Sequence, residues 1–261
     1  MWWYFSTSQG WNSFLSDVAH VSNGNEVIGV GDTVEFIIGE LKNKANCLEC
    51  QPPYLIKMED HFSALLPNGS LWNYELVTTY QLEEYENLTK VTVFVEKYTD
   101  DEAMQWVREC GSTGWKQTLF NLKCIIELGL DLRNDIFNYP RLGVLNYTAT
   151  EEQLNNQNLL SKTKGNFIKK VYPNSPAHSA GLKDGDIIVT IAGEDVPTYD
   201  HFVKILSSYY KKNTEVDVIF FRDGEELLTK VHLTYDDQFT GMIDPKTISL
   251  EEVSRIRKMK S

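Results

Sequence analysis

Polar and apolar residues alternate along five segments in the first part of the chain. A period of two is typical of half-buried β-strands, because successive side chains point to opposite faces of a sheet. Short breaks separate the segments, and Asn68-Gly69 within one break is a strong hairpin signal. Consecutive strands with short connections predict an antiparallel meander. The expected strands span 31–41, 44–50, 54–66, 70–84 and 88–98.

The apolar period changes to that of a helix after these strands. Thr99 is expected to cap a first helix over 100–110, whose acidic first turn suits the helix dipole. After Gly111 and Gly114, a longer helix is expected to run to Asn134 and to lie across the concave face of the sheet. Its apolar stripe consists of Trp115, Leu119, Leu122, Ile126 and Leu130, widened by Phe120, Cys124 and Leu128.

The second half of the chain predicts a compact series of short elements. Gly181 is expected to close a one-turn helix, and Gly185 to form a tight turn with positive φ. Thr198 suits the cap of an amphipathic helix, and Asp223-Gly224 is a strong hairpin turn. The expected strands are 165–172, 187–196, 215–221 and 226–235, and the expected helices are 177–181 and 199–210.

The charge is distributed unevenly between the two halves. The 261 residues carry a net charge of −12, of which −11 falls within 1–140 and −1 within 141–261. This asymmetry predicts two units of different character, and an acidic first half argues against nucleic-acid binding. No apolar run is long enough to span a membrane, and the N-terminus lacks the pattern of a secretory signal. We therefore expect a cytoplasmic protein.

Cys47 and Cys50 have the CxxC spacing of zinc ribbons and redox motifs. Both fall on an expected strand, where positions three apart face opposite sides and the thiols would diverge. No second CxxC or CxxH completes a set of four ligands. We expect structural cysteines, no metal and no cofactor.

The second half resembles a bacterial PDZ domain of the kind appended to HtrA proteases. The residues that carry the resemblance are Ser175-Pro176-Ala177, Ala180-Gly181-Leu182, Asp184-Gly185-Asp186-Ile187-Ile188, the helix from Thr198 and Arg222-Asp223-Gly224. The resemblance implies capture of a peptide C-terminus as an added strand, with the carboxylate held by backbone N–H groups of the loop 141–144. The implied groove residues are Arg141, Leu142, Gly143, Val144, Phe202 and Leu206.

Plain core packing is the alternative for Leu142, Val144 and Leu206. His201 is expected to be either a reader of a peptide hydroxyl or a solvated surface residue. The long polar segment 148–165 departs from the family pattern, and we expect it to cover part of the groove.

The first half resembles the START-like (SRPBCC) superfamily, within it the family related to the activator of the heat-shock chaperone ATPase (AHSA-like). The residues are 5–17 (FSTSQGWNSFLSD), 31–41 (GDTVEFIIGEL) and 111–129 (GSTGWKQTLFNLKCIIELG). That fold begins with a strand for which only Met1-Trp2-Trp3 remains here, so dimerisation through an incomplete edge is expected. The resemblance implies a hydrophobic cavity for an apolar ligand, lined by Trp11, Phe14, Phe36, Phe62, Trp72, Tyr74, Trp115 and Leu119.

Simple core packing is the alternative for these aromatic residues. Glu59 and His61 are expected to share one face of a strand while Asp60 faces the other, and a surface pair is favoured over a catalytic one.

The expected fold class is α+β: a helix-grip antiparallel sheet wrapped on a long helix, plus a small PDZ-type β-barrel or sandwich with two helices. The expected boundaries are 1–135 for the START-like domain, 136–240 for the PDZ domain and 241–261 for a tail. The tail is expected to form a short helix capped by Ser249 and Glu252, with cations gathered near its end.

We expect a non-enzymatic adaptor that binds peptide C-termini and an apolar ligand or a chaperone client. The alternatives are a START-like enzyme of the cyclase or hydrolase type with a PDZ targeting module, and a chaperone co-factor.

Overall fold

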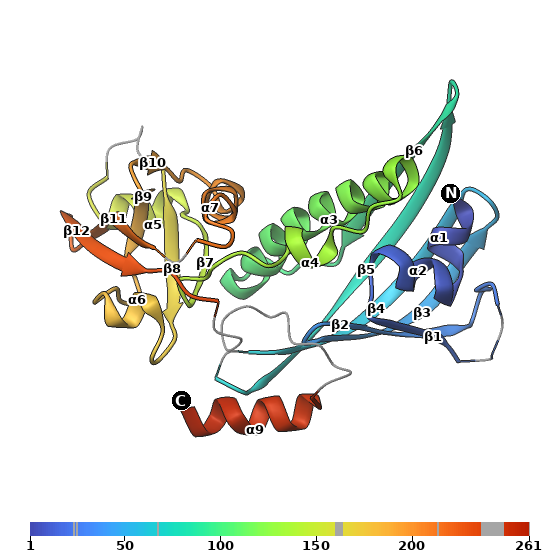
Figure 1. Cartoon of the computed structure of the whole chain (residues 1–261), viewed down its shortest axis with the longest axis horizontal. Coiled ribbons are helices and arrows are strands. Elements are labelled where there is room, and N and C mark those ends of the chain that lie inside the picture. The colour runs from blue at the N-terminus through green and yellow to red at the C-terminus, as the bar shows by residue number, and fades with distance from the viewer. Residues whose placement is uncertain are drawn as a thin grey trace. The chain divides into compact units, whose positions relative to one another are not determined.

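The computed structural model describes residues 1–22, 24, 26–66, 68–159, 164–212, 214–235 and 248–260. The chain divides into two compact units, shown in Figure 1. The first contains Met1–Thr99, Trp115–Arg133 and the described part of Met242–Arg255; the second contains Asp100–Gly114 and the described parts of Asn134–Gly241 and Ile256–Ser261. The expected boundary between 240 and 241 lies outside the described residues.

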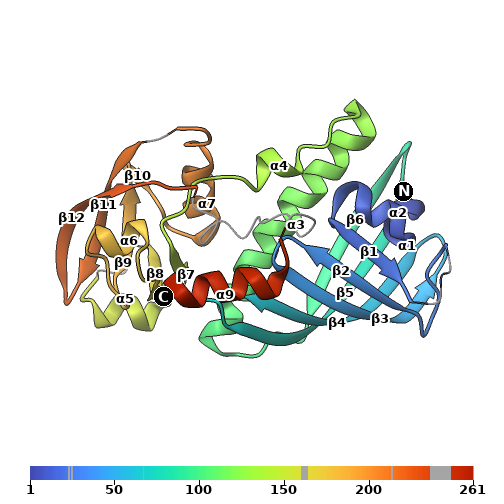
Figure 2. The ribbon, with the colours of Figure 1, turned by 60° about the horizontal axis from the view of Figure 1, so that its bottom comes forward.

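The first unit is built on a six-stranded antiparallel sheet whose strands follow one another in sequence order. The five expected strands are confirmed, and the long twisted strands are visible in Figures 1 and 2. A four-residue first strand and two short helices were not predicted, because each is too short to show a hydrophobic period. The elements are α1 (Trp2–Ser6), α2 (Ser8–Phe14), β1 (Val18–Val21), β2 (Thr33–Ile38), β3 (Leu41–Gln51), β4 (Leu55–Leu65), β5 (Leu71–Tyr85) and β6 (Leu88–Glu96).

A single helix, α3 (Glu102–Leu128), replaces the two helices expected around Gly111 and Gly114. The predicted break was wrong, since each glycine costs a helix only about 1 kcal/mol and tertiary packing outweighs that cost. The predicted cap was also wrong: Asp101 Oδ1, not Thr99, accepts the N–H of Met104 at 2.9 Å. The boundary between the two units falls inside this helix, after Gly114.

The core of the first unit is rich in aromatic rings. Phe5, Trp11 and Phe14 are fully buried, and Trp11 meets Phe36 edge-to-face at 5.1 Å between ring centroids. From the second half of α3, Trp115 and Leu119 pack against the same cluster. This unit therefore has the antiparallel sheet that its sequence predicts. The predicted helix stripe packs only in part, because Phe120, Ile126, Leu128 and Leu130 are exposed.

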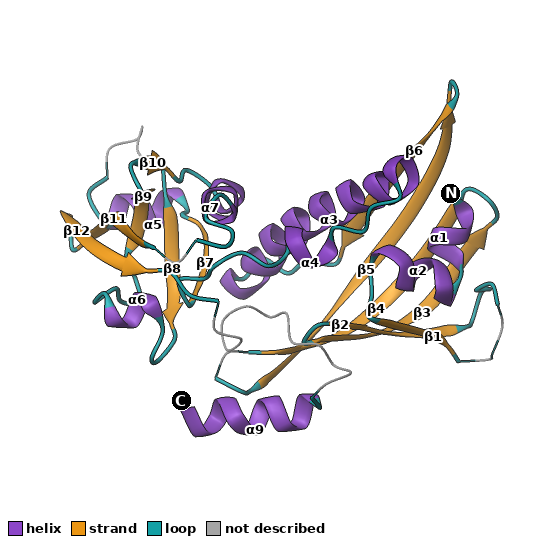
Figure 3. Cartoon of the chain, viewed as in Figure 1, coloured by secondary structure: helices purple, strands orange, loops and turns teal. Residues whose placement is uncertain are grey.

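The second unit contains a second antiparallel sheet, with the strand order β12-β11-β9-β8-β7 and β10 paired to β9. Figure 3 shows short helices around these strands. The strands are β7 (Val144–Thr148), β8 (Asn166–Val171), β9 (Ile187–Ile191), β10 (Glu194–Asp195), β11 (Glu215–Arg222) and β12 (Glu225–His232). The helices in this part of the chain are α4 (Arg133–Ile136), α5 (Glu151–Asn156), α6 (Pro176–Ser179) and α7 (Tyr199–Ser207).

The turn chemistry expected for this unit is confirmed. Gly181 and Gly185 have φ of 79° and 94°, and the β11–β12 hairpin turns through Asp223 and Gly224 with φ of 53° and 82°. The Thr198 hydroxyl accepts the N–H of His201 at 3.3 Å and caps α7.

The described part of the segment 148–165 does not cover the face on which it was expected. Thr150 caps α5 with a complete capping box. Leu159 and the half-buried Leu154 then pack with Ile187 and Val189, in a cluster separate from the main core. Because β-strand side chains alternate, Ile187 and Val189 face away from the main core, and the insertion covers this outer face.

The chain ends in α9 (Leu250–Lys260), whose predicted cap is confirmed by the bond from Glu252 N–H to Ser249 Oγ at 3.2 Å. The expectation of an exposed cation cluster fails at Arg257, whose side chain is only 2% exposed. Burial raises the pKa of the Tyr172 phenol and the Arg257 charge opposes that rise, so the guanidinium lies near this ring. None of the described helices is long and apolar enough to cross a membrane.

Candidate functional site

The loop 141–144 leads into β7, the edge strand of the second sheet. Gly143 has a φ of 75°, a backbone conformation that glycine adopts without the Cβ clash of other residues. The Leu142 carbonyl accepts the N–H of Ala177 at 2.9 Å, and the Gly143 carbonyl accepts the N–H of Tyr172 at 3.1 Å. Both carbonyls therefore point into the unit.

The direction of these carbonyls determines where the N–H groups of the loop point. In a planar trans peptide, the C=O of one residue and the N–H of the next point in opposite directions. The N–H groups of Gly143 and Val144 therefore point away from Ala177 and Tyr172. Among the described residues, no backbone or side-chain acceptor is recorded for the N–H groups of Leu142 and Gly143. Such a loop can hold an anion.

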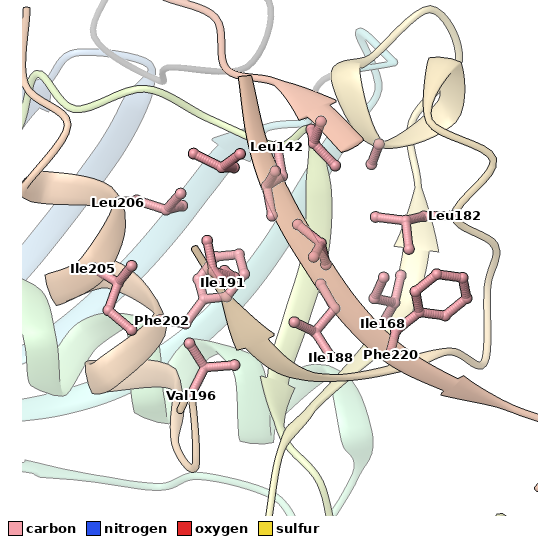
Figure 4. Packing of buried hydrophobic residues seen from close by; sticks show 14 of the residues in the cluster. Leu142, Ile168, Leu182, Ile188, Ile191, Val196, Phe202, Ile205, Leu206 and Phe220 are labelled. Carbon is pink, nitrogen blue, oxygen red and sulfur yellow. The ribbon is translucent and has the colours of Figure 1, made fainter. Parts of the chain in front are cut away.

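The structure brings the six predicted groove residues to one region but gives them different roles. Leu142 and Leu206 are each 1% exposed and Phe202 is 5% exposed, all within the main core cluster shown in Figure 4. Val144 is half-buried against that cluster. The half-buried Arg141 stacks its guanidinium 3.3 Å from the centroid of the Tyr139 ring. Val144 and Arg141 are thus the half-buried members of the set, whereas Gly143 is buried like Leu142.

His201 is exposed, and its Nδ1 lies 2.8 Å from the Thr198 hydroxyl in the cap of α7. This position matches the expectation of a solvated surface residue.

Sequence reasoning missed a hydrogen-bonded group at the far end of β7. The Thr148 N–H donates to Glu109 Oε2 at 3.0 Å, and the Thr148 carbonyl accepts from Gln105 Nε2 at 2.9 Å. The Thr148 hydroxyl also donates to Glu109 Oε2 at 2.7 Å and accepts the N–H of Tyr199 at 3.0 Å. Gln105 and Glu109 belong to the first half of α3, which is part of this unit. No sequence signal marked them, because polar residues at helical spacing ordinarily face solvent.

The cavity residues expected in the first unit fall into two groups. Trp11, Phe14 and Phe36 are at most 4% exposed and lie within the core, against which Trp115 and Leu119 pack. The other three form a half-buried stack on β4 and β5, with centroid distances of 5.1 and 5.0 Å: Phe62, Tyr74 and Trp72. The first group has the arrangement of a packed core.

The Glu59-Asp60-His61 cluster is oriented as the strand period predicts. Glu59 accepts from Lys97 at 2.8 Å, and His61 Nδ1 lies 3.1 Å from Glu75 on the exposed face. Asp60 is 2% exposed on the opposite face, where burial raises its pKa to about 6. Bonds from the Asn43 amide and Thr78 partly offset that rise.

The two cysteines of the CxxC motif do not diverge as expected. A β-bulge between Cys47 and Glu49 shifts the register, so that Cys47 pairs with Met58 and Cys50 with Ile56. Met58 and Ile56 share one face of β4, and both thiols consequently face the interior. Burial raises the pKa of Cys47 to about 11. Within the described residues, no group of metal-binding side chains is found.

A family model described as a PDZ domain matches residues 167–219. The chain is also 35% identical over 78 residues to the serine protease Do-like HtrA of Bacillus subtilis, a match that covers 30% of this chain and 17% of that protein. A probable periplasmic serine endoprotease of Marinomonas, DegP-like, is 32% identical over 98 residues, covering 38% of this chain and 20% of that protein. The chain thus spans a fifth or less of the length of either protein.

Among solved structures, the HtrA3 PDZ domain bound to a phage-derived ligand (FGRWV) is 23% identical. The match covers 36% of this chain and 85% of that chain with a TM-score of 0.30. The family model and the sequence relatives show that this chain contains a PDZ domain of the HtrA type. The START-like resemblance of the first unit stays a prediction.

Proposed function

We propose that this PDZ-containing chain is a binding protein that captures peptide C-termini at the loop 141–144 and along the edge of β7. The observation that carries the proposal is the pair of N–H groups at Leu142 and Gly143, which have no recorded acceptor among the described residues. A terminal carboxylate supplies the missing acceptor, with two oxygens and a full negative charge.

The peptide's backbone would extend the second sheet as an added strand, which is the general mode of peptide recognition by PDZ domains. Val144 and the Arg141 side chain would lie nearest to its last residues. Leu142, Phe202 and Leu206 would form the floor of the site from within the core.

The test is fluorescence polarisation of the full chain with labelled FGRWX peptides, in which the last residue X is varied over all residue types. Each peptide is compared with its C-terminally amidated twin. Binding that requires the free carboxylate supports the proposal. Equal binding of both forms, or binding of neither form of any peptide, contradicts it.

A matched pair of variants places the binding at this loop. Gly143 and Gly193 both have positive φ, 75° and 81°, so alanine imposes a similar backbone strain of about 1–2 kcal/mol at either position. Gly143→Ala is expected to weaken peptide binding at least tenfold, whereas Gly193→Ala in the β9–β10 turn leaves it unchanged. Equal effects would assign the loss to general destabilisation.

A second candidate function belongs to the first unit: binding of a small apolar ligand that carries a hydrogen-bond donor. The favouring observation is that Asn43 Oδ1 and Asp60 Oδ2 are buried without a hydrogen-bond partner among the described residues. Buried polar atoms in proteins are ordinarily paired, so a ligand hydroxyl or amide suits them. Native mass spectrometry of the purified chain and of Asp60→Leu tests this; a ligand mass that persists in the variant would contradict it.

A further inference from the structure

The outward edge of β7 is where an added peptide strand must form its hydrogen bonds. Residues alternate along an edge strand, and those whose N–H and C=O point away from β8 are available to a new strand. Val144 and Thr148 lie four positions apart on β7 and therefore present their backbone groups on the same side. At Thr148 these groups are already bonded, the N–H to Glu109 and the C=O to Gln105.

Gln105 and Glu109 together imitate one residue of an added strand. The Glu109 carboxylate supplies the acceptor that a peptide carbonyl would supply, and the Gln105 amide supplies the donor. The two side chains are one helical turn apart and are joined to each other by a 3.1 Å bond from Gln105 Nε2 to Glu109 Oε1. The pair thus presents an ordered donor and acceptor to the strand edge.

The same half of α3 also contacts the first turn of α7, the helix on the other side of the groove. Thr113 Oγ1 donates to Asp200 Oδ1 at 3.1 Å. Trp106 and Cys110 pack against the main core cluster of this unit. The Cys110 thiol is hydrogen-bonded to the Tyr199 hydroxyl. Burial is the main cause of the raised pKa of Cys110. Contacts from this half-helix therefore reach both β7 and α7, the two elements between which the PDZ resemblance implies the groove.

We infer that residues 102–113 of α3 are an internal occupant of the PDZ groove and compete with a peptide for the edge of β7 at Thr148. This inference rests on the proposed function, because competition requires a peptide that binds there. Thr148 has a single N–H, so a peptide carbonyl and the Glu109 carboxylate cannot both accept it.

Features of α3 make this occupant displaceable. Gly111 and Gly114 weaken the helix at the end of the docked half. A Cβ at Gly114 would meet no atom within 4 Å, so packing does not require glycine there. The ion pair from Glu102 to Lys169 is roughly half exposed on both sides, and such pairs stabilise little. The docked half is held by these polar contacts, by the partly buried Trp106 and Cys110, and by Met104 and Val107, which are 8% and 6% exposed.

The test compares the full chain with Gln105→Ala/Glu109→Ala, and with Ser112→Ala as an exposed control on the same half-helix. The probe is the labelled FGRWX peptide with a free carboxylate that binds the full chain most tightly. The double variant is expected to bind it on the order of tenfold more tightly, because the competing contacts are lost. The control should bind like the parent chain.

A second readout does not depend on any peptide. Trypsin releases Cys110 and Cys124 in separate peptides, so mass spectrometry can follow alkylation of each thiol in the folded chain. The double variant is expected to speed alkylation of Cys110 and to leave that of Cys124, buried in the first unit, unchanged. Unchanged affinity together with unchanged Cys110 alkylation overturns the inference.

A reversible lock distinguishes the two proposals. Thr113→Cys/Asp200→Cys places a disulfide where the two side chains now touch, and should abolish probe binding until the disulfide is reduced. Probe binding that persists in the oxidised chain overturns the competition. If no variant binds any peptide while Cys110 alkylation still accelerates, peptide capture fails and docking of the helix stands.

Discussion

The buried carboxylate of Asp186 stabilises the turn that the Gly185-Asp186 motif predicts. Its side chain is 1% exposed. Its Oδ1 accepts a hydrogen bond from Arg222 Nε and its Oδ2 one from Arg222 Nη2, each at 2.7 Å. Oδ2 also accepts the N–H of Lys183 at 2.7 Å. Burying a charge is costly unless it is paired and hydrogen-bonded, and these three bonds satisfy that condition.

Asp186→Asn is expected to lower the free energy of unfolding by about 3 kcal/mol, because it leaves the Arg222 charge without its anion. Thermal and denaturant unfolding measure the change. The matched control is Asp217→Asn, which breaks an exposed pair with Lys230 and should have little effect. Similar losses of unfolding free energy in both variants would contradict the prediction that the buried pair stabilises more than the exposed one.

Asp60 makes stability depend on pH in the opposite sense to a surface carboxylate. Its folded-state pKa of about 6 lies above the unfolded value near 3.9, so the folded state holds the proton more tightly. Its stabilising contribution is present below about pH 4 and is lost as pH rises through 6. Asp60→Asn does not titrate. The unfolding free energy of the variant minus that of the parent chain is therefore expected to rise by up to about 3 kcal/mol from pH 4 to pH 7.

Unfolding free energies of the parent chain and Asp60→Asn across this pH range measure that gain. All other titrating groups cancel in the difference. Parallel pH profiles would show that the Asp60 carboxyl is not buried as described.

At the scale of elements, local pattern and tertiary packing diverge at identifiable places. The strand pattern of β3 is correct, but the bulge after Cys47 reverses the face of every later residue. The helical pattern after residue 100 is also correct, but the glycines do not divide it.

At α1 and α2 the Thr7 hydroxyl both accepts the N–H of Gly10 and donates to the Trp3 carbonyl, each at 2.9 Å.

Gly10→Ala is expected to be strongly destabilising, by about 3 kcal/mol or more, since a Cβ would lie 2.1 Å from the Trp3 oxygen and 2.7 Å from Tyr4 Cα. Both neighbours are backbone atoms and cannot rotate away. The contrasting variant is Gly114→Ala, which meets no atom and should stabilise α3 by up to about 1 kcal/mol. Thermal unfolding of both variants checks the sign of each change.

At the scale of the whole molecule, segments distant in sequence complete each unit. The first half of α3 belongs to the second unit and its second half to the first. The C-terminal helix returns to the first unit, where Ser254 Oγ donates to the Gly69 carbonyl at 2.7 Å. Val253 on the same helix is 2% exposed. Contacts between segments so far apart in sequence cannot be predicted from the local pattern of residues.

Val253→Ala is expected to lower the unfolding free energy by about 1–2 kcal/mol, since it removes buried methyl groups. Met259→Ala on the same helix is the control, because Met259 is 80% exposed. A thermal shift for Val253→Ala no larger than that of the control would show that this helix is not docked.

Two antiparallel sheets, the caps of α7 and α9 and the turn glycines were predictable from the sequence. They depend on period, caps and backbone conformation, which neighbouring residues determine. The PDZ domain was predictable for the same reason, because its turns at Gly181, Gly185 and Asp223-Gly224 are short-range features. The loop at Gly143 was implied by the resemblance to a PDZ domain, and its role stays a prediction.

Tertiary structure decided which side chains meet. It buried Leu142 and Leu206 in the core, turned the two thiols to one face, sent the insertion to the outer face of the second sheet, and placed Gln105 and Glu109 against Thr148. The last pairing joins residues 39 to 43 positions apart. Its two partners read in sequence as ordinary solvated helix residues, because a hydrogen bond between distant segments depends on how the chain folds back.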